Sequence, residues 1–253
     1  MKIVRYRKGR RTGFGVVDGG TLHAAHGSLN AGFHTGPAVA LLDEVKILPP
    51  VKPSKVLAIG RNYLEHAEEL GNALPPEPLL FIKAPTAVIG IGDPIVLPKD
   101  AGRIDYEAEL VAVIGRTARN VSEAEAMDVV LGFTCGNDVT ARELQNKDGQ
   151  WARAKSFDSF APLGPAIITG IGPEGRGIQC RVNGRVVQDA NTNDLIFKLP
   201  RLISFVSRVM TLLPGDILYT GTPSGIGALS PGDVVEVEVE GVGLLRNPVI
   251  AEA

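Results

Sequence analysis

The chain has 253 residues, 44% of them hydrophobic, with a formal net charge of −2 at pH 7 and a pI near 6.1. This length allows one large domain or one and a half, and the charge offers no basic surface for nucleic acid. Two cysteines, Cys135 and Cys180, are too few for a disulfide framework and fit a reducing compartment. Because the sequence shows neither a signal segment nor an apolar run of about 18 residues, we expect a cytoplasmic protein that does not bind membranes.

The first 50 residues predict a small β-rich unit. Short apolar segments alternate with glycine-rich turns between residues 2 and 47, and the basic residues 5–11 predict a solvated hairpin tip. Pro49, Pro50 and Pro53 then interrupt the pattern. We therefore predict an N-terminal unit over residues 1–50 and a main domain over residues 51–253.

The main domain predicts a strand-rich α+β fold, because apolar runs bounded by glycine and proline outnumber the segments with helical spacing. Predicted strands cover residues 55–60, 79–83 and 110–115, and Asn183-Gly184 between two alternating arms predicts a hairpin. Predicted helices cover residues 63–70, ended by Gly71, residues 122–132, with a Ser122–Glu125 capping box and a terminal Gly132, and residues 200–213.

Three acidic residues stand at the ends of these apolar segments. Glu107 and Glu109 lie two residues apart in DYEAEL, and Asp138 follows the apolar residues 129–136. In a strand, residues i and i+2 share a face roughly 7 Å apart. Carboxylates that repel each other in an apolar setting must be protonated or held by a cation, and oxygen ligands suit Mg²⁺, Mn²⁺ or Ca²⁺.

The alternative interpretation is an acidic strand face in water. Residues 234–240, VVEVEVE, illustrate it, and we predict that they form an exposed strand edge. The E-x-E pattern alone is therefore weak evidence for a metal. Glu107 differs because its segment continues directly into the apolar run of residues 110–115, which predicts a buried strand.

Two pairs of residues with helical spacing could also carry chemistry. His66 and Glu69 are three residues apart, so they share a helix face, and the carboxylate would orient the imidazole as a general base. Arg142 and Gln145 have the same spacing just after Asp138, where the arginine could hold a substrate carboxylate. In both cases the alternative is a solvated helix face, which the spacing taken alone favours.

Lys155 and Thr222 are further candidates. Lys155 lies in sequence among Trp151, Phe157 and Phe160, where desolvation would lower its pKa and suit it to proton donation, while the alternative is a lysine that covers apolar surface. Thr222 lies in the turn TGTPSGIG, which either holds an anion with its hydroxyl and backbone N–H groups or is an ordinary turn.

Seven segments together resemble the fumarylacetoacetate hydrolase superfamily. They cover most of residues 55–247 in the family's order: GRNYLEHAEEL, LFIKAPTAVIG, DYEAELVAVIG, GNDVTARELQ, QWARAKSFDSFAPLGP, VNGRVVQ and MTLLPGDILYTGTPSGIG. The short N-terminal unit resembles that of bacterial catabolic members, such as 2-hydroxyhepta-2,4-diene-1,7-dioate isomerases and acylpyruvases. It departs from the larger N-terminal domain of fumarylacetoacetase, which argues against fumarylacetoacetate as the substrate.

The resemblance implies a mixed β-roll catalytic domain in a homodimer, with Mg²⁺ or Mn²⁺ as the cofactor and Ca²⁺ as a substitute. It implies metal ligands at Glu107, Glu109 and Asp138. It also implies catalytic roles for His66, Glu69, Lys155 and Gln145, and substrate contacts for Arg61, Tyr63, Arg142 and Thr222.

The resulting hypothesis is a metal-dependent enzyme that acts on enolisable 2-oxo carboxylic or dicarboxylic acids through a metal-stabilised enolate. We expect most of all an isomerase or decarboxylase of the 2-hydroxyhepta-2,4-diene-1,7-dioate type in aromatic catabolism. Acylpyruvate hydrolysis and oxaloacetate decarboxylation stay open, as does a non-catalytic 2-oxo acid binding protein. His66, Glu69 and Lys155 favour an enzyme, because a binding site needs neither a base nor a proton donor.

Overall fold

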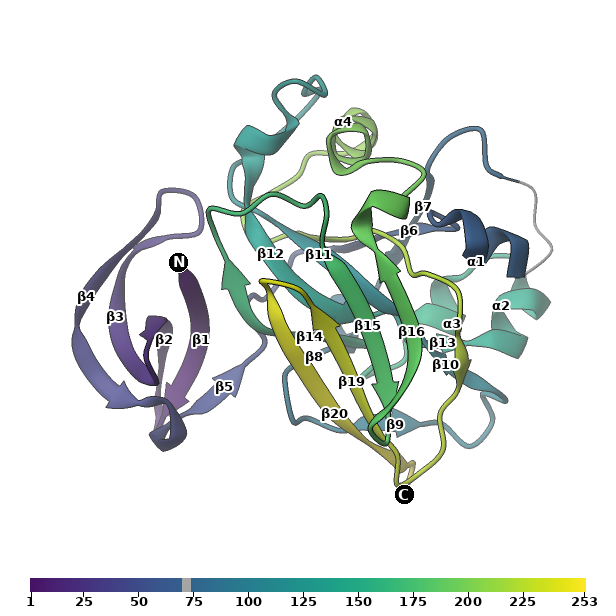
Figure 1. Ribbon diagram of the computed structural model, residues 1–253, viewed down its shortest axis with the longest axis horizontal. Helices are drawn as coiled ribbons and strands as arrows, with labels where there is room; N and C mark the ends of the chain where they lie inside the picture. Colours follow the sequence, from purple (N-terminus) through teal and green to yellow (C-terminus); the bar gives the residue numbers. More distant parts are fainter. Residues whose placement is uncertain (70–73) are drawn as a thin grey trace.

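The structure is a computed structural model that describes residues 1–69 and 74–253, and residues 66–68 by their backbone alone. Most of its elements are strands, which confirms the predicted α+β class (Figure 1). The strands are β1 (Lys2–Lys8), β2 (Arg11–Asp18), β3 (Thr21–Ser28), β4 (Gly32–Leu41), β5 (Lys46–Leu48), β6 (Val56–Gly60), β7 (Leu79–Lys83), β8 (Val88–Ile89), β9 (Ile95–Leu97), β10 (Ile104–Tyr106), β11 (Ala108–Ile114), β12 (Val130–Asn137), β13 (Thr140–Ala141), β14 (Ala161–Ile168), β15 (Gly177–Val182), β16 (Arg185–Asn191), β17 (Ile217–Tyr219), β18 (Gly227–Ala228), β19 (Val234–Val239) and β20 (Gly243–Ala251). The helices are α1 (Leu64–Glu69), α2 (Arg142–Asp148), α3 (Ala152–Lys155) and α4 (Leu199–Val209), with 3₁₀ turns η1 (Leu42–Glu44), η2 (Pro85–Ala87), η3 (Ala126–Val129) and η4 (Thr192–Asp194).

The described strands form three sheets. The largest has 12 strands, in the order β4-β3-β2-β1-β14-β12-β11-β17-β6-β7, with β5 beside β1 and β8 beside β14. A five-stranded sheet, β16-β15-β19-β20-β9, packs against β11, β12 and β14, and β13-β10-β18 form the third sheet. The pairs β6–β17, β8–β14 and β9–β20 are parallel and the rest are antiparallel, so the fold is mixed.

Strand β11 lies at the centre of the molecule and is buried along its whole length. Leu110 and Ala112 belong to the core shared with the five-stranded sheet, whereas Val111 and Val113 face a second core on the other side. Burial on both faces explains the continuous apolar run and confirms the predicted buried strand. Because side chains alternate along a strand, Glu109 points to the same side as Val111.

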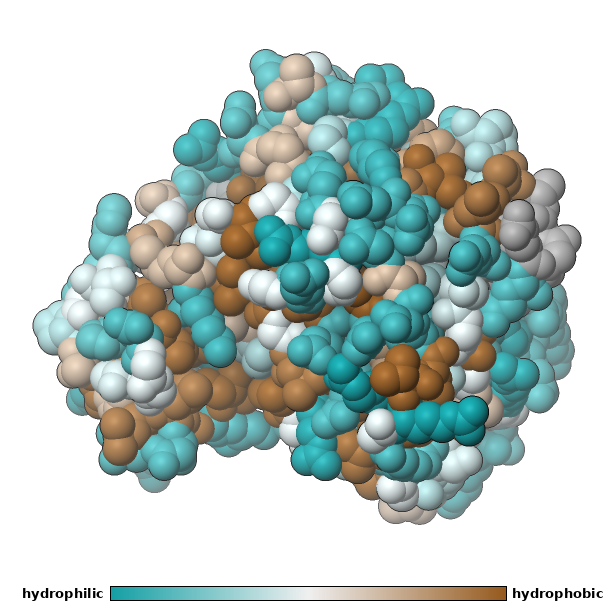
Figure 2. All heavy atoms as spheres, viewed as in Figure 1, coloured by the Kyte–Doolittle hydropathy of each residue, from teal (hydrophilic) through white to brown (hydrophobic). Residues whose placement is uncertain are grey.

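The N-terminal strands β1–β5 form a lobe at one end of the molecule (purple in Figure 1). Its sheet continues into the main body, since Ile3 of β1 pairs with Ile167 of β14. Ile3 and Phe33 also belong to the same core as Val111. Hydrophobic side chains gather where the lobe meets the body (Figure 2). The basic hairpin tip is confirmed, because β1 and β2 pair up to Lys8 and Arg11.

The predicted helix over residues 122–132 was wrong. Residues 122–125 form a turn, η3 follows, and β12 begins at Val130. The Ser122 backbone N–H and hydroxyl both donate to Glu125 Oε2, at 3.2 and 2.7 Å, so the capping pattern closes a turn here. Gly132 lies inside β12. The pairing of β12 with β11 and β14 determines its conformation, and this tertiary pairing overrides the local pattern that predicted a helix.

Gly132 permits the close approach of β12 to β14. A Cβ atom at this position would lie 2.3 Å from the carbonyl oxygen of Ile168. We expect Gly132→Ala to destabilise the protein by about 1–3 kcal/mol, because backbone cannot move aside as a flexible side chain can. Urea unfolding measures this change. Gly172→Ala is the control, since its nearest atom is the flexible Glu174 carboxylate at 3.3 Å, and equal stabilities of the two variants would contradict the expectation.

The prediction that residues 234–240 form a sheet edge was also wrong. Strand β19 lies inside the five-stranded sheet, between β15 and β20. Its glutamates do lie on a partly solvated face: Glu238 pairs with Arg181 at 2.7 Å and Glu236 with Arg246 at 3.2 Å. Alternation along the strand therefore predicted the face, but the number of neighbouring strands is a tertiary property.

The predicted hairpin and two of the predicted helices are confirmed in outline. Asn183 and Gly184, with φ of 53° and 79°, join β15 to β16 in the predicted hairpin. The helix predicted over residues 200–213 is α4, which ends at Val209, so Leu213 lies beyond it. The helix predicted over residues 63–70 is α1, and its predicted end at Gly71 lies outside the described residues. The longest described helix, α4, has 11 residues, and none of the described helices is suited to cross a membrane.

Candidate active site

Three carboxylates meet where β11 begins and β12 ends. Glu107 lies between β10 and β11, Glu109 lies in β11, and Asp138 directly follows β12. The two strands pair with Ala108 opposite Asn137, and the Asp138 N–H donates to the Glu107 carbonyl over 2.8 Å. One oxygen of each carboxylate lies within 4.8 Å of the others, and all three residues are buried. The structure thus brings together the three predicted metal ligands.

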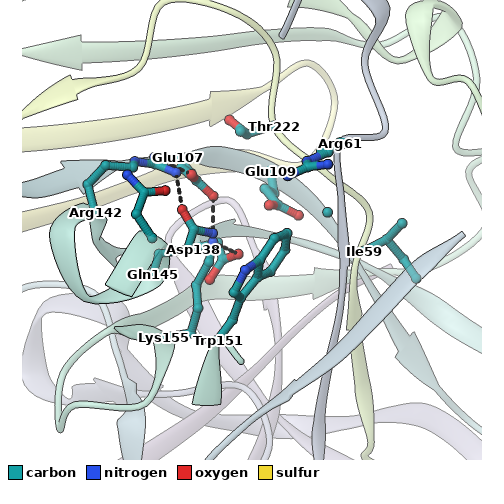
Figure 3. A pocket seen from close by; sticks show the side chains of 12 residues that line it. Ile59, Arg61, Glu107, Glu109, Asp138, Arg142, Gln145, Trp151, Lys155 and Thr222 are labelled. Carbon is teal, nitrogen blue, oxygen red and sulfur yellow. Dashed lines mark hydrogen bonds and ion pairs between the residues drawn. The ribbon is translucent and has the colours of Figure 1, made fainter. Parts of the chain in front are cut away.

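The carboxylates open into a cavity of about 260 Å³ (Figure 3). Most of the predicted site residues line it, although they come from segments far apart in the sequence. The lining residues are Ile59, Gly60, Arg61, Glu107, Glu109, Asp138, Arg142, Gln145, Asn146, Trp151, Lys155 and Thr222.

Lys155, at the end of α3, bridges two of the carboxylates. Its Nζ lies 2.8 Å from Glu107 Oε2 and 2.5 Å from Asp138 Oδ2, and 5.0 Å from the ring centroid of Phe81. Burial opposes the charge, but Asp138 and Glu107 outweigh it, and the pKa of Lys155 lies above its ordinary value. The prediction that desolvation lowers this pKa was therefore wrong, because it left out the carboxylates that the fold brings to the ammonium group.

Lys83 is a second buried lysine, which the sequence analysis treated only as part of a strand. It ends β7 and is fully buried, and its Nζ forms an ion pair with Asp138 Oδ1 and donates to the Phe160 carbonyl over 2.6 Å. Burial lowers the pKa of Lys83 more than Asp138 raises it. The two oxygens of Asp138 thus face two different lysines. The available signal was a charged residue at the end of the apolar run LLFIK.

Arg142, the first residue of α2, holds Glu107 in place. Its Nη2 lies 2.6 Å from Glu107 Oε1, its Nε lies 3.0 Å from Asp105 Oδ2, and its Nη1 donates to Gln145 Oε1 over 2.7 Å. Asp105 is fully buried and also accepts from Arg103. The predicted i, i+3 pair of Arg142 and Gln145 therefore exists, and Asp105 is an anchor that the sequence analysis did not identify.

Glu109 has a different environment from the other two carboxylates. Its Oε2 accepts from the Gly221 N–H over 2.6 Å. Burial, followed by the charges of Asp138 and Glu107, raises the pKa of Glu109 well above its ordinary value. Of the three carboxylates, Glu109 therefore has less positive charge close to it than Glu107 and Asp138 have.

This donor set fits a hard divalent cation. Glu107, Glu109 and Asp138 offer carboxylate oxygens, which Mg²⁺ and Mn²⁺ prefer. A divalent charge would also offset the repulsion that raises the Glu109 pKa.

The raised Glu109 pKa predicts pH-dependent metal binding. Glu109 has to lose its proton to become a ligand, so affinity should rise with pH, and a proton should be released, at pH values where an ordinary glutamate is already ionised. Titration calorimetry of Mn²⁺ between about pH 5 and pH 8, in buffers of different ionisation enthalpy, measures both effects. A constant affinity without proton release would contradict the assignment.

The remaining predicted residues belong to the segment between residues 61 and 69. Arg61 lines the cavity with its guanidinium 5.9 Å from the Trp151 ring centroid. Tyr63 is buried, and its hydroxyl has no hydrogen-bond partner among the described residues. Glu69 in α1 accepts from the Gly225 N–H over 3.1 Å. The side chain of His66 falls outside the described part of the structure, so its pairing with Glu69 stays a prediction.

Known proteins resemble this chain over its whole length. A family model described as fumarylacetoacetate (FAA) hydrolase C-terminal matches residues 55–250, and one described as Rv2993c-like, N-terminal, matches residues 1–50. An uncharacterized protein of Archaeoglobus fulgidus is 59% identical over 209 residues, which are 83% of this chain and 84% of that protein.

Some of the similar proteins carry functional names. The mitochondrial oxaloacetate tautomerase fahd2 of Xenopus laevis is 42% identical over 219 residues, 81% of this chain and 69% of that protein. The solved structure of 2-hydroxyhepta-2,4-diene-1,7-dioate isomerase from Mycobacterium marinum has a TM-score of 0.93 and 38% identity, and the match covers 100% of this chain and 99% of that one. The family match and these relatives agree with the seven motifs: the chain belongs to the fumarylacetoacetate hydrolase family.

Proposed function

We propose that this protein is a divalent-metal-dependent enzyme that interconverts the keto and enol forms of a 2-oxo dicarboxylic acid. The observation that carries the proposal is the group of three buried carboxylates in one cavity with Lys155. Two similar proteins support the reaction class, since one is named an oxaloacetate tautomerase and the other a 2-hydroxyhepta-2,4-diene-1,7-dioate isomerase.

Glu107, Glu109 and Asp138 would hold Mg²⁺ or Mn²⁺, whose charge would polarise the 2-oxo group and acidify the protons on C3. Arg142 and Lys83 each bind one ligand carboxylate, so they keep these oxygens oriented. Arg142 already binds Glu107 and Asp105, and we therefore assign it to ligand orientation ahead of substrate binding.

Lys155 is the residue that we assign to the proton transfer. Its ammonium group lines the cavity and is kept charged by Glu107 and Asp138. In ketonisation the ammonium group would donate a proton to C3 while the enol O–H gives its proton to solvent, and the neutral amine would then regain a proton from solvent. Enolisation would follow the same steps in reverse. The Thr222 hydroxyl and the Arg61 guanidinium, which also line the cavity, bind the negatively charged oxygens of the substrate.

Cleavage of a C–C bond, by decarboxylation or hydrolysis, is the second candidate. Glu69 contacts the backbone of Gly225, so α1 lies against the loop that follows Thr222. His66 in this helix is the residue that we predict to act as the base that activates water for an acylpyruvate substrate.

Two assays run in parallel test these candidates. Loss of the enol absorbance of oxaloacetate reports tautomerisation, and pyruvate release from oxaloacetate and a short acylpyruvate reports cleavage, each with Mg²⁺ or Mn²⁺ and again with EDTA. Metal-dependent enol loss above the buffer rate without pyruvate supports the proposal. Metal-dependent pyruvate would replace it by the second candidate, and binding of these acids without turnover would identify a binding protein.

A further inference from the structure

Gln188 connects the metal-ligand segment to the loop that carries Thr222. It lies in β16 with 1% of its surface exposed, and its side chain reaches both places. The Ala108 N–H, between Glu107 and Glu109, donates to Gln188 Oε1 over 3.0 Å. Gln188 Nε2 donates to the Pro223 carbonyl over 2.8 Å and to Thr222 Oγ1 over 2.9 Å.

These partners allow only one orientation of the amide. A backbone N–H can only donate and a carbonyl can only accept, so exchanging the oxygen and nitrogen of Gln188 would break the bonds to Ala108 and Pro223. Both protons of Nε2 are then used, one for Pro223 and one for Thr222. The Thr222 hydroxyl is therefore the acceptor in its contact with Gln188.

A hydroxyl that accepts from one partner keeps its single proton for another. Thr222 is 3% exposed and lines the cavity, and it donates no hydrogen bond to any described residue. In Figure 3, Thr222 lies on the far side of the carboxylates from Lys155. The proton of the Thr222 hydroxyl is thus left to be donated to an acceptor in the cavity.

We propose that Gln188 is a positioning residue that fixes the Thr222 hydroxyl as a donor to a carboxylate oxygen of the substrate. The inference rests on the proposed function and narrows its substrate class, because the group bound here must accept a hydrogen bond and a carboxylate is the strongest such acceptor in the proposed substrate. A substrate with an amide or ester at this position would gain less, since a hydrogen bond to a charged oxygen is roughly twice as strong as a neutral one.

The proposal is tested by replacing the hydrogen-bond donor of residue 188 that faces Thr222 with an acceptor. In Gln188→Glu one oxygen still accepts from the Ala108 N–H. The other faces Thr222, whose hydroxyl turns to donate to it, and the Pro223 carbonyl, which loses its donor. We expect Mn²⁺-loaded protein to bind oxalate about 10- to 100-fold more weakly by titration calorimetry, while the affinity for Mn²⁺ alone changes less than about 3-fold. Thr222→Val should lower the affinity for oxalate by a similar factor. Thr222→Ser, which keeps a hydroxyl, should bind oxalate more tightly than Thr222→Val.

A double-variant cycle separates positioning from a general structural effect. Because both changes remove the same donor, the double variant Gln188→Glu, Thr222→Val should bind oxalate no more weakly than the weaker of the two single variants. Gln188→Met removes the hydrogen bond to Thr222 without reversing its direction, so it should lose less affinity for oxalate than Gln188→Glu. It replaces Gln188→Glu in the test if that variant unfolds. Gln179→Glu in β15, whose amide donates to Asp189, is the matched control and should bind like the wild type.

The outcomes separate this inference from the proposed function. Two results would overturn the role of Gln188 and leave the proposed function standing. One is a double variant whose loss of affinity for oxalate is the product of the two single losses. The other is a Gln188→Glu variant that loses affinity for Mn²⁺ and for oxalate in parallel. A wild-type protein that binds neither Mn²⁺ nor oxalate would overturn both.

Discussion

Lys155→Met is expected to lower turnover by about 10²- to 10⁴-fold, the contribution typical of a general acid–base residue. The variant keeps a side chain of similar length but has no proton to exchange with C3. Its affinity for Mn²⁺ should equal or exceed that of the wild type, because the Lys155 ammonium binds Glu107 and Asp138, two of the proposed ligands. Enol-absorbance kinetics with saturating Mn²⁺ measure the first effect, and titration calorimetry measures the second.

Arg153→Met is the matched control for this experiment. Arg153 lies in the same helix, α3, but its side chain is 53% exposed and pairs with Asp148 away from the cavity. The control removes one positive charge from the same helix and should retain wild-type turnover. If Lys155→Met keeps more than about a tenth of the wild-type rate at saturating Mn²⁺, Lys155 does not transfer the proton.

Local signals in the sequence predicted much of the group formed by the carboxylates of Glu107, Glu109 and Asp138. The two-residue period of a strand predicted that Glu107 and Glu109 lie on one side, although Glu107 itself precedes β11, and the apolar run after them predicted the burial of β11. The position of Asp138 at the end of another apolar run allowed it to meet them. Pairing of β11 with β12 then brought the three together, a step that the family resemblance implied and local spacing does not contain.

What local patterns did not predict depends on contacts between distant residues. Lys83 is 55 positions from Asp138 in sequence, and Gln188 is 80 from Ala108, so nothing near either residue indicates its partner. The same reason explains the incorrect pKa direction of Lys155, whose carboxylate partners come from other elements. It also explains β19, whose E-x-E pattern resembles that of β11 although the strand lies in another sheet.

Glu109→Gln is the second substitution with a large expected effect. It should weaken the binding of Mn²⁺ and stabilise the metal-free protein. The amide keeps the shape of the side chain and can still accept from the Gly221 N–H, but it removes one negative charge from the group. The affinity for Mn²⁺ should fall by at least about 100-fold, more than the loss typical of residues behind the ligands. The metal-free protein, in contrast, should become more stable at pH values where Glu109 is ionised in the wild type, because a buried charge near Asp138 and Glu107 is lost there.

The stability gain should depend on pH in a defined direction. A carboxyl group whose pKa is raised by folding stabilises the folded state at low pH, where it is protonated, and this contribution is lost as pH rises through the folded pKa. Glutamine cannot ionise. The difference in Tm between Glu109→Gln and the wild type, measured without metal, should therefore be small in acid and grow as the pH increases.

Glu238→Gln is the control that shares the sequence pattern and lacks the environment. Glu238 belongs to the E-x-E pattern of β19, but its side chain is 47% exposed and pairs with Arg181. Its removal should change neither the affinity for Mn²⁺ nor the pH profile of Tm beyond a small effect. If metal-free Glu109→Gln has a lower Tm than the wild type at every pH, the Glu109 charge does not destabilise the fold. Removing a metal ligand would then act through packing alone, and a cation would not be needed to offset the repulsion among the three carboxylates.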